Sequence, residues 1–458
     1  MQEKPVVIVI SDLHLGGGQS DPGDDHVYDQ AQLCNFIREK LLNTPEGQRG
    51  DLELFINGDF LDFAQTDQEA YRLSSGEAWC SEAESLAKLK VMLDGHADIF
   101  EALRQFGEGG NLVTIAAGNH DVDLFWPAVQ KGLCDRVGQI QFVLSEEWSS
   151  RFQGQLRIAH GHQKDKGNRF KHWDAPFVKG SDGQKRLEMC PGTLFMVKFV
   201  NRLENAYPFA DNIKPISALA GILGREDKLG ALTVAWMLSK FCLTHPQTTL
   251  EADASGGRDF ASVLVDLIRS NSELGKQFAA WYRTYMDANK PDAAVREDLR
   301  NEDTLAALLL QVMRHEPPSA WEEVLDRVPA GHATLGAEEG TLELGLSQIK
   351  DEKESFREVA KAELANRTTR IVILGHTHSP DGVPDGVPDG LPLGEGKQYF
   401  NPGSWTRYAE VGSQKKLKLE DLRDESKFPY QLNYVRVEMQ GTKAVGKMHT
   451  FSELQPPK

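Results

Sequence analysis

Residues 6–14 have the sequence VVIVISDLH, an apolar run that ends in a carboxylate and an imidazole. The first five residues are β-branched, which is typical of a strand buried on both faces of a sheet. Alternate side chains of an extended chain point the same way, so Asp12 and His14 would face together while Leu13 turns into the core. The stretch therefore predicts a buried strand that presents two polar side chains at its carboxyl end.

Four further apolar runs end in the same way. Their sequences are LELFINGD (52–59), NLVTIAAGNHD (111–121), QLRIAHGH (155–162) and RIVILGHTH (370–378). Open α/β sheets place their ligands at the carboxyl ends of such strands. Each run also contains a glycine at its end, where the backbone must turn sharply to present the polar side chain. The sequence thus predicts an α/β fold whose strand ends converge on one site.

The polar residues at these strand ends are of types that bind divalent transition metals. A carboxylate can bridge two cations, imidazoles suit zinc, manganese, iron or nickel, and an amide oxygen adds a neutral ligand that leaves a position for solvent. We therefore predict two divalent metal ions, with Mn favoured over Fe, Zn or Ni. The seven candidate ligands are Asp12, His14, Asp59, Asn119, His160, His376 and His378.

The motif set D-x-H, G-D, G-N-H-D, H-G-H and G-H-T-H, in this order, resembles that of the calcineurin-like metallophosphoesterase superfamily. The resemblance covers about residues 5–175 and 366–450. It implies an α/β fold of the four-layer αββα metallophosphoesterase type. It also implies that Asp59 bridges two ions, the first held by Asp12, His14, Asp59 and His378 and the second by Asp59, Asn119, His160 and His376.

The same resemblance implies an enzyme that hydrolyses phosphoric esters. In that superfamily a metal-bridging hydroxide attacks phosphorus, so this chain would cleave a phosphodiester or pyrophosphate bond. His120 resembles the superfamily's histidine that contacts the phosphate and the leaving oxygen, and Asp121 would orient its imidazole. These two residues are the expected catalytic pair.

Within the superfamily, the motifs are most similar to those of the UDP-2,3-diacylglucosamine pyrophosphohydrolase-like bacterial members. Those enzymes have a much shorter helical lid between the fourth and fifth motifs, and they usually have arginine where this chain has His120. The resemblance implies an anionic phosphoester substrate that is small, or linked to a lipid or a nucleotide.

Three other functions remain alternatives: a metal-dependent nuclease of the same superfamily, a phosphomonoesterase, and a non-catalytic scaffold on this fold. The formal net charge of −17 argues against a general affinity for nucleic acid, because phosphate neutralisation leads such binding. Scaffold relatives typically lose metal ligands, and all seven are present here. The phosphomonoesterase is separable from the diesterase by assay alone.

A basic segment, residues 163–186, follows the candidate ligand His160. Most such charge runs are solvated loops, but the position beside the metal motif favours binding of an anionic substrate by Arg169 and Lys164. His162 lies either near the substrate or in a simple turn. All three are candidate substrate-binding residues.

The interval 180–365 is predicted to be a helical insertion, between core segments 1–179 and 366–458. Strand signals vanish there, and apolar or amphipathic stretches replace them at 194–203, 216–223, 231–243, 260–268, 274–286 and 304–313. A module between two ligand-bearing strands would be a cap or lid, or an oligomerisation module. Amphipathic helices would also permit peripheral membrane contact with a lipid substrate.

Composition agrees with a globular cytoplasmic enzyme of 458 residues, with 40% hydrophobic and 26% charged residues. No apolar stretch approaches the ~20 residues of a membrane span. The five cysteines are widely spaced and form no C-x-x-C pair, which favours free thiols in a reducing compartment. Repeated D-G-V-P after residue 380 predicts a surface loop, and residues 398–405 and 431–450 predict a further strand end and a closing hairpin.

Overall fold

The protein is described from a computed structural model. The described residues are 3–18, 30–66, 81–144, 148–190 except 166, 181 and 182, 192–193, 196–197, 201, 207–210, 212–214, 222, 272–300, 304, 308, 311–312, 352–381, 391–392, 396–410 and 417–451. The chain divides into two compact units, the first formed by residues 1–212, 350–409 and 425–458 and the second by residues 213–349 and 410–424.

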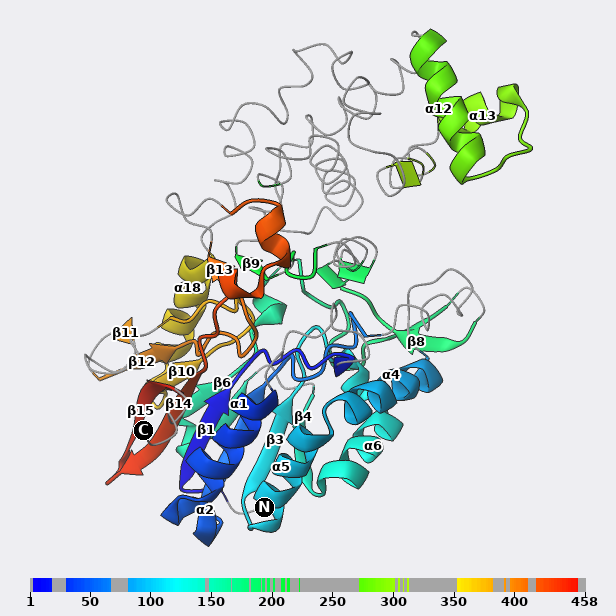
Figure 1. Cartoon of the computed structure of the whole chain (residues 1–458). Coiled ribbons are helices and arrows are strands. Elements are labelled where there is room, and N and C mark those ends of the chain that lie inside the picture. Colours follow the sequence, from blue (N-terminus) through cyan, green and yellow to red (C-terminus); the bar gives the residue numbers. More distant parts are fainter. Residues whose placement is uncertain are drawn as a thin grey trace. The chain divides into compact units, whose positions relative to one another are not determined.

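The first unit contains a six-stranded mixed sheet (Figure 1). Four neighbouring strands, β1 to β4 in chain order, run parallel, and β14 and β15 extend the sheet antiparallel beside β1. The six strands are β15 (Lys443–Thr450), β14 (Asn433–Gln440), β1 (Val6–Ile10), β2 (Leu52–Asn57), β3 (Leu112–Ala116) and β4 (Ile140–Val143).

A second sheet of five strands also belongs to the first unit. Its three central strands, β6, β10 and β12, are parallel, and the edge strands β5 and β11 are antiparallel to them. In sheet order the strands are β11 (Leu391–Pro392), β12 (Gln398–Phe400), β10 (Ile371–Ile373), β6 (Leu156–Ile158) and β5 (Ser149–Arg151).

Helices cover one face of the six-stranded sheet (Figure 1). Ile8 and Ile10 of β1 point to this face and belong to the same buried cluster as Phe100 and Leu103 of a covering helix. Ser81 and Glu84 form a capping box that begins another of these helices. The helical segments of this layer are α1 (Gln30–Asn35), the π-helical η3 (Phe36–Leu42), α4 (Glu82–Gly95), α5 (Ala97–Glu108) and α6 (Pro127–Val137).

The opposite face of the six-stranded sheet packs against the five-stranded sheet. Val7 and Val9 of β1 share a buried cluster with Ile371 and Ile373 of β10. The residues of β1 therefore alternate between two apolar surfaces, which explains why the strand is a continuous β-branched run.

Helix α18 (Glu352–Leu364) covers the outer face of the five-stranded sheet. Phe356, Ala360 and Leu364 recur at helical spacing and are buried against Val372 and Tyr399 of the sheet. The first unit is thus mixed α/β, with layers in the order helices, sheet, sheet, helix.

The predicted α/β class and the strands that precede the metal motifs are confirmed, as are the strand at 398–400 and the hairpin of β14 and β15. In the second unit, α12 (Ser272–Tyr285) confirms the helix expected at 274–286, and α13 (Asp292–Asp298) follows it. The helices expected at 231–243 and 260–268, most of those at 194–203, 216–223 and 304–313, and the D-G-V-P repeat after its first residue, Asp381, lie outside the described residues.

The second unit does not coincide with the predicted insertion of 180–365, because it comprises residues 213–349 and also residues 410–424. The hairpin of β7 (Phe177–Lys179) and β8 (Lys185–Leu187) belongs to the first unit, because Phe177 packs against Trp126 and Leu187 is part of the main core. Helix α18 belongs there too, since it packs on the five-stranded sheet.

Shorter elements complete the described structure: α2 (Pro45–Arg49), η4 (Val122–Phe125), η5 (Phe152–Gly154), η6 (His162–Lys164), β9 (Ile213–Lys214), β13 (Ala409–Glu410), η8 (Glu420–Arg423) and η9 (Glu425–Lys427). Across the described ranges, none of the helices combines the length and the apolar character that crossing a membrane requires.

Candidate metal centre

The seven candidate ligands all lie just beyond the carboxyl ends of five strands. Strands β1, β2 and β3 supply four of them from the six-stranded sheet, and β6 and β10 supply three from the five-stranded sheet. These strands are parallel within each sheet, and side chains from both sheets lie within 4.8 Å of one another, so the carboxyl ends of the two sets of strands form one rim. Five of the side chains are buried, and those of His376 and His378 are partly buried.

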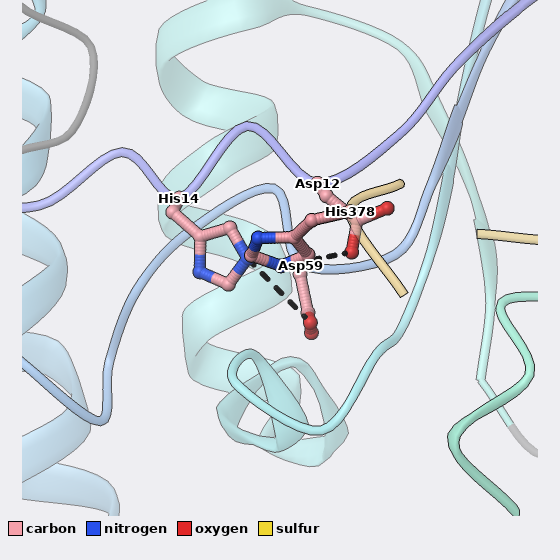
Figure 2. A group of neighbouring side chains, drawn as sticks. All are labelled: Asp12, His14, Asp59 and His378. Carbon is pink, nitrogen blue, oxygen red and sulfur yellow. Dashed lines mark hydrogen bonds and ion pairs between the residues drawn. The ribbon is translucent and has the colours of Figure 1, made fainter. Parts of the chain in front are cut away.

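A first group consists of Asp12, His14, Asp59 and His378, whose ligand atoms lie within 4.8 Å of one another. Figure 2 shows the four side chains turned toward one another. The Nε2 atoms of His14 and His378 are 3.0 Å apart, His14 Nε2 is 3.8 Å from Asp59 Oδ2, and His378 Nε2 is 3.5 Å from Asp12 Oδ1. Such spacing suits ligand atoms that share one cation, since metal–nitrogen bonds are about 2.0–2.1 Å long.

A second group consists of Asp59, His160 and His376, again within 4.8 Å. His160 Nε2 lies 3.1 Å from Asp59 Oδ2, and its Nδ1 lies 2.7 Å from the backbone oxygen of Asn57. That backbone contact fixes the imidazole so that Nε2 points at Asp59. Asp59 therefore belongs to both groups, as expected of a bridging ligand.

Three buried polar atoms at the site lack a hydrogen-bond partner among the described residues: Asp12 Oδ1, Asn119 Oδ1 and His376 Nδ1. In each residue the other polar atom is engaged, since Asp12 Oδ2 accepts from Ser11 Oγ and Asn119 Nδ2 donates to Asn168. A buried polar atom without a partner is costly, and two cations would satisfy these atoms, one at Asp12 Oδ1 and the other at Asn119 Oδ1 and His376 Nδ1. The donor set therefore fits divalent metal ions.

The backbone is strained at these same residues. Seven described non-glycine residues have positive φ, and five of them are candidate ligands. The left-handed region is uncommon for residues with a Cβ, and such strain gathers at functional sites. The five are Asp12 (55°), His14 (45°), Asp59 (48°), His376 (70°) and His378 (56°).

The buried carboxylates give the centre a negative potential. Burial raises the pKa of Asp59, but the imidazoles of His160 and His120 outweigh this effect and hold it well below its usual range. Burial lowers the pKa of His160, but the carboxylates of Asp59 and Asp12 outweigh burial and raise it to about 10. A potential that holds a proton on a buried imidazole also favours a divalent cation.

Asp62 contacts two histidines at once. Its Oδ2 lies 2.7 Å from His14 Nδ1, and its Oδ1 lies 3.0 Å from His120 Nδ1. These three residues form another candidate metal group, but the distances are those of hydrogen bonds in which one carboxylate orients two imidazoles. The contact leaves His14 Nε2 directed at the first group.

The prediction that Asp121 orients His120 is therefore corrected, because the carboxylate that contacts the His120 ring is that of Asp62. Asp121 instead accepts hydrogen bonds from the backbone N–H groups of Gly118 and Phe60 and so holds the turn that follows β3. Sequence reasoning missed Asp62, although a second carboxylate in the run Asp59-Phe60-Leu61-Asp62 was a visible signal.

The electrostatics of His120 follow from this carboxylate. Burial lowers the pKa of His120, but the charges of Asp62 and Asp59 outweigh burial and raise it to about 9. Burial raises the pKa of Asp62, but His120 and His14 more than reverse that effect and hold it far below its usual range. The carboxylates of Asp62 and Asp59 thus favour the protonated form of the His120 imidazole.

The three predicted substrate-binding residues lie in or next to η6, in the loop after β6. His162 is buried and packs against Trp173, with ring centroids 4.3 Å apart. Burial and the nearby charge of His160 hold the pKa of His162 well below its usual range, so its ring is neutral. Lys164 and Arg169 are exposed, and Arg169 Nε donates to the backbone oxygen of Gln163. Contact of these residues with a substrate stays a prediction.

Two residues near the carboxyl end of β12 hold the ligand-bearing backbone. Asn401 Nδ2 donates to the backbone oxygen of Gly375, and Ser404 Oγ donates to the backbone oxygen of Asp12, at 3.0 and 2.7 Å. Both contacts are with the backbone of the ligand-bearing turns. Asn401 and Ser404 thus stabilise the turns that carry Asp12 and His376.

Position 118 must be glycine because its backbone lies very close to the Asp59 side chain, and a substitution there tests the metal site. A Cβ at this position would lie 2.1 Å from Asp59 Oδ1. We expect Gly118→Ala to displace Asp59, to lower stability by about 1–3 kcal/mol and to abolish tight metal binding. Urea unfolding and calorimetric titration with Mn²⁺ measure the two effects.

Gly107→Ala is the matched control, because a Cβ there meets no atom within 4 Å and the position is helical. We expect that variant to bind metal like the wild type and to be at least as stable. Unchanged metal affinity in Gly118→Ala would contradict the packing argument.

No protein-family model matches this chain, and no curated protein matches it either. The chemistry of the centre therefore rests on its own residues, which form two buried groups that could each hold a metal ion and that share Asp59.

Proposed function

We propose that this protein is a dinuclear-metal phosphohydrolase of the calcineurin-like metallophosphoesterase type, which cleaves a phosphodiester or pyrophosphate bond. The observation that carries the proposal is the sharing of Asp59 by two buried ligand groups on one rim of strand ends. The layer order of helices, sheet, sheet and helix also suits the four-layer αββα architecture of that superfamily.

Each candidate ligand would bind one of two metal ions, and Asp59 would bind both. The first ion would be held by Asp12, His14, Asp59 and His378, and the second by Asp59, Asn119, His160 and His376. Two divalent ions, when bound, supply a water of lowered pKa and neutralise charge on the phosphoryl oxygens. Carboxylate, amide and imidazole ligands suit Mn, Fe, Zn or Ni, of which Mn is favoured.

His120 would act on the leaving group. Its Nδ1–H donates to the Asp62 carboxylate, which fixes the ring and leaves Nε2–H for the substrate. The His120 side chain is 12% exposed, so a bound ester can reach it. A protonated imidazole in this position contacts a phosphoryl oxygen and gives its proton to the departing alkoxide or phosphate.

The charge of the chain favours a small substrate over a polynucleotide. With a net charge of −17, the protein lacks the general positive potential that nucleic-acid binding uses. The exposed Lys164 and Arg169 offer local cations in the loop that follows the ligand His160, and these suit a single anionic group.

The proposal is tested with full-length protein reconstituted with Mn²⁺ and assayed on a substrate panel. The panel holds bis-p-nitrophenyl phosphate, p-nitrophenyl phosphate, cyclic nucleotides, UDP-sugars and oligonucleotides. We expect metal-dependent hydrolysis of the diester or the pyrophosphate, which a chelator abolishes.

Hydrolysis of the monoester alone would overturn the preference for diesters. Cleavage of oligonucleotides in preference to the small substrates would identify a nuclease. Two bound ions without hydrolysis of any substrate would favour the scaffold.

A further inference from the structure

The loop after β6 returns to the second ligand group through two polar side chains, Asp165 and Asn168. Asp165 Oδ2 lies 3.2 Å from His376 Nε2, and Asn168 Oδ1 lies 3.4 Å from Asn119 Nδ2. The two side chains are joined to each other, since Asn168 Nδ2 donates to Asp165 Oδ2 at 2.6 Å. One connected network therefore touches two candidate ligands of the second ion.

Asp165 determines which nitrogen of His376 can bind a metal. Two groups face His376 Nε2: Asp165 Oδ2 at 3.2 Å and Asn168 Nδ2 at 3.3 Å. Asn168 Nδ2 donates to Asp165 Oδ2 at the shorter distance of 2.6 Å, and a carboxylate only accepts, so a hydrogen bond between His376 and Asp165 places the proton on His376 Nε2. A neutral imidazole then has its lone pair on Nδ1, the buried atom without a hydrogen-bond partner among the described residues. The Gly167 N–H donates to Asp165 Oδ1 at 2.8 Å and keeps the carboxylate in this orientation.

Asn168 determines which end of the Asn119 amide faces the centre. Its Nδ2 faces Asp165 Oδ2 and His376 Nε2, so its Oδ1 is on the opposite side and accepts from Asn119 Nδ2. The oxygen of Asn119, which is the ligand atom of the two, is left buried and without a hydrogen-bond partner in the described part of the chain. The charge of Asp165 thus sets the orientation of both ligands.

A second chain segment closes over the loop. The Gly192 N–H donates to the backbone oxygen of Gly167 at 2.7 Å, and a Cβ on Gly192 would lie 2.0 Å from Asn168 Oδ1. The site can therefore be disturbed from outside the loop by the addition of one methyl group.

We propose that Asp165 and Asn168 are positioning residues that select Nδ1 of His376 and Oδ1 of Asn119 as ligand atoms of the second ion. The inference rests on the proposed dinuclear centre and extends it to residues outside the ligand set. The first group has its own supports, because Asp62 orients His14 and Ser11 holds Asp12.

The test is calorimetric titration of metal-free, full-length protein with Mn²⁺, with electron paramagnetic resonance to detect the coupled Mn²⁺ pair. We expect Asp165→Ala and Asn168→Ala to weaken the second binding step about 10–100-fold and to leave the first unchanged. Gly192→Ala is also expected to weaken the second binding step. Asp174→Ala is the control, since it removes an exposed carboxylate from the same segment.

Asp12→Ala and His160→Ala identify the two binding steps, because they remove a ligand of the first and of the second ion respectively. Unchanged affinities in both Asp165→Ala and Asn168→Ala, or equal weakening of both steps, would overturn the inference. If the wild type binds two ions and hydrolyses its substrate while these variants bind metal normally, only this inference fails. If the wild type binds no metal, the proposed function fails first.

Discussion

Replacement of Asp59 with asparagine is expected to remove the coupled metal pair and to reduce hydrolysis to background. Asp59 is the one residue in both ligand groups, and its Oδ2 faces His14 at 3.8 Å and His160 at 3.1 Å. A neutral amide cannot balance two divalent charges, and its NH₂ group would face one of the imidazoles. Among the seven candidate ligands, no other single substitution should affect both ions so strongly.

Metal content by inductively coupled plasma analysis and thermal unfolding with added Mn²⁺ measure this effect. A ligand at about 100 times its Kd stabilises a folded protein by about 2.7 kcal/mol. We expect the wild type to gain stability of that order and Asp59→Asn to gain almost none.

Asp12→Asn serves as the matched comparison, because Asp12 belongs to the first group alone. That variant should keep one ion and part of the metal-dependent stabilisation. Retention of two ions by Asp59→Asn would refute the shared-carboxylate arrangement, and with it the proposed function.

His120→Asn is expected to lower kcat by about 10²–10⁴-fold with metal content unchanged. His120 lies beside the candidate ligand Asn119, but its own ring nitrogen contacts Asp62. The variant removes the proton donor without removing any of the seven candidate ligands. Steady-state kinetics and metal analysis of the same preparation separate the two effects.

Asp62→Asn provides a second, distinguishable result. Asp62 orients both His120 and His14, so this variant should lose turnover and also bind the first ion more weakly. Lost metal in His120→Asn, or full activity in Asp62→Asn, would contradict the roles given to this pair.

Much of the fold could be predicted from local pattern. A strand buried on both faces needs an apolar residue at every position, and β1 shows this pattern from Val6 to Ile10. The ligand motifs were recognisable because each directly follows such a strand. The boundaries of the insertion were harder to predict, because the amphipathic pattern of α18 resembles that of a helix in the second unit. In the structure, Phe356 of α18 packs on the five-stranded sheet.

The supporting residues could not be predicted in the same way. Asp121 is adjacent to His120 in the chain, yet Asp62 is the residue that contacts its ring. Strand β2 lies beside β3 in the sheet, so the turns that follow them exchange contacts that chain distance does not reveal. Asp165 and Asn168 could not be predicted either, because in the sequence they are two polar residues of a basic loop, and only the fold places that loop beside His376.

The sequence by itself determined the α/β class, the order of the strands that carry ligands and the seven candidate ligands. Each of these depends on short stretches of sequence, because a continuous apolar run predicts a buried strand and the residue type predicts a metal ligand. Only the tertiary structure showed that the side chain of Asp59 reaches both groups, that Asp62 holds two imidazoles, and that Asn119 Oδ1 and His376 Nδ1 are buried without a hydrogen-bond partner among the described residues. Those choices depend on hydrogen bonds between residues distant in the chain, which form only after the two sheets have packed.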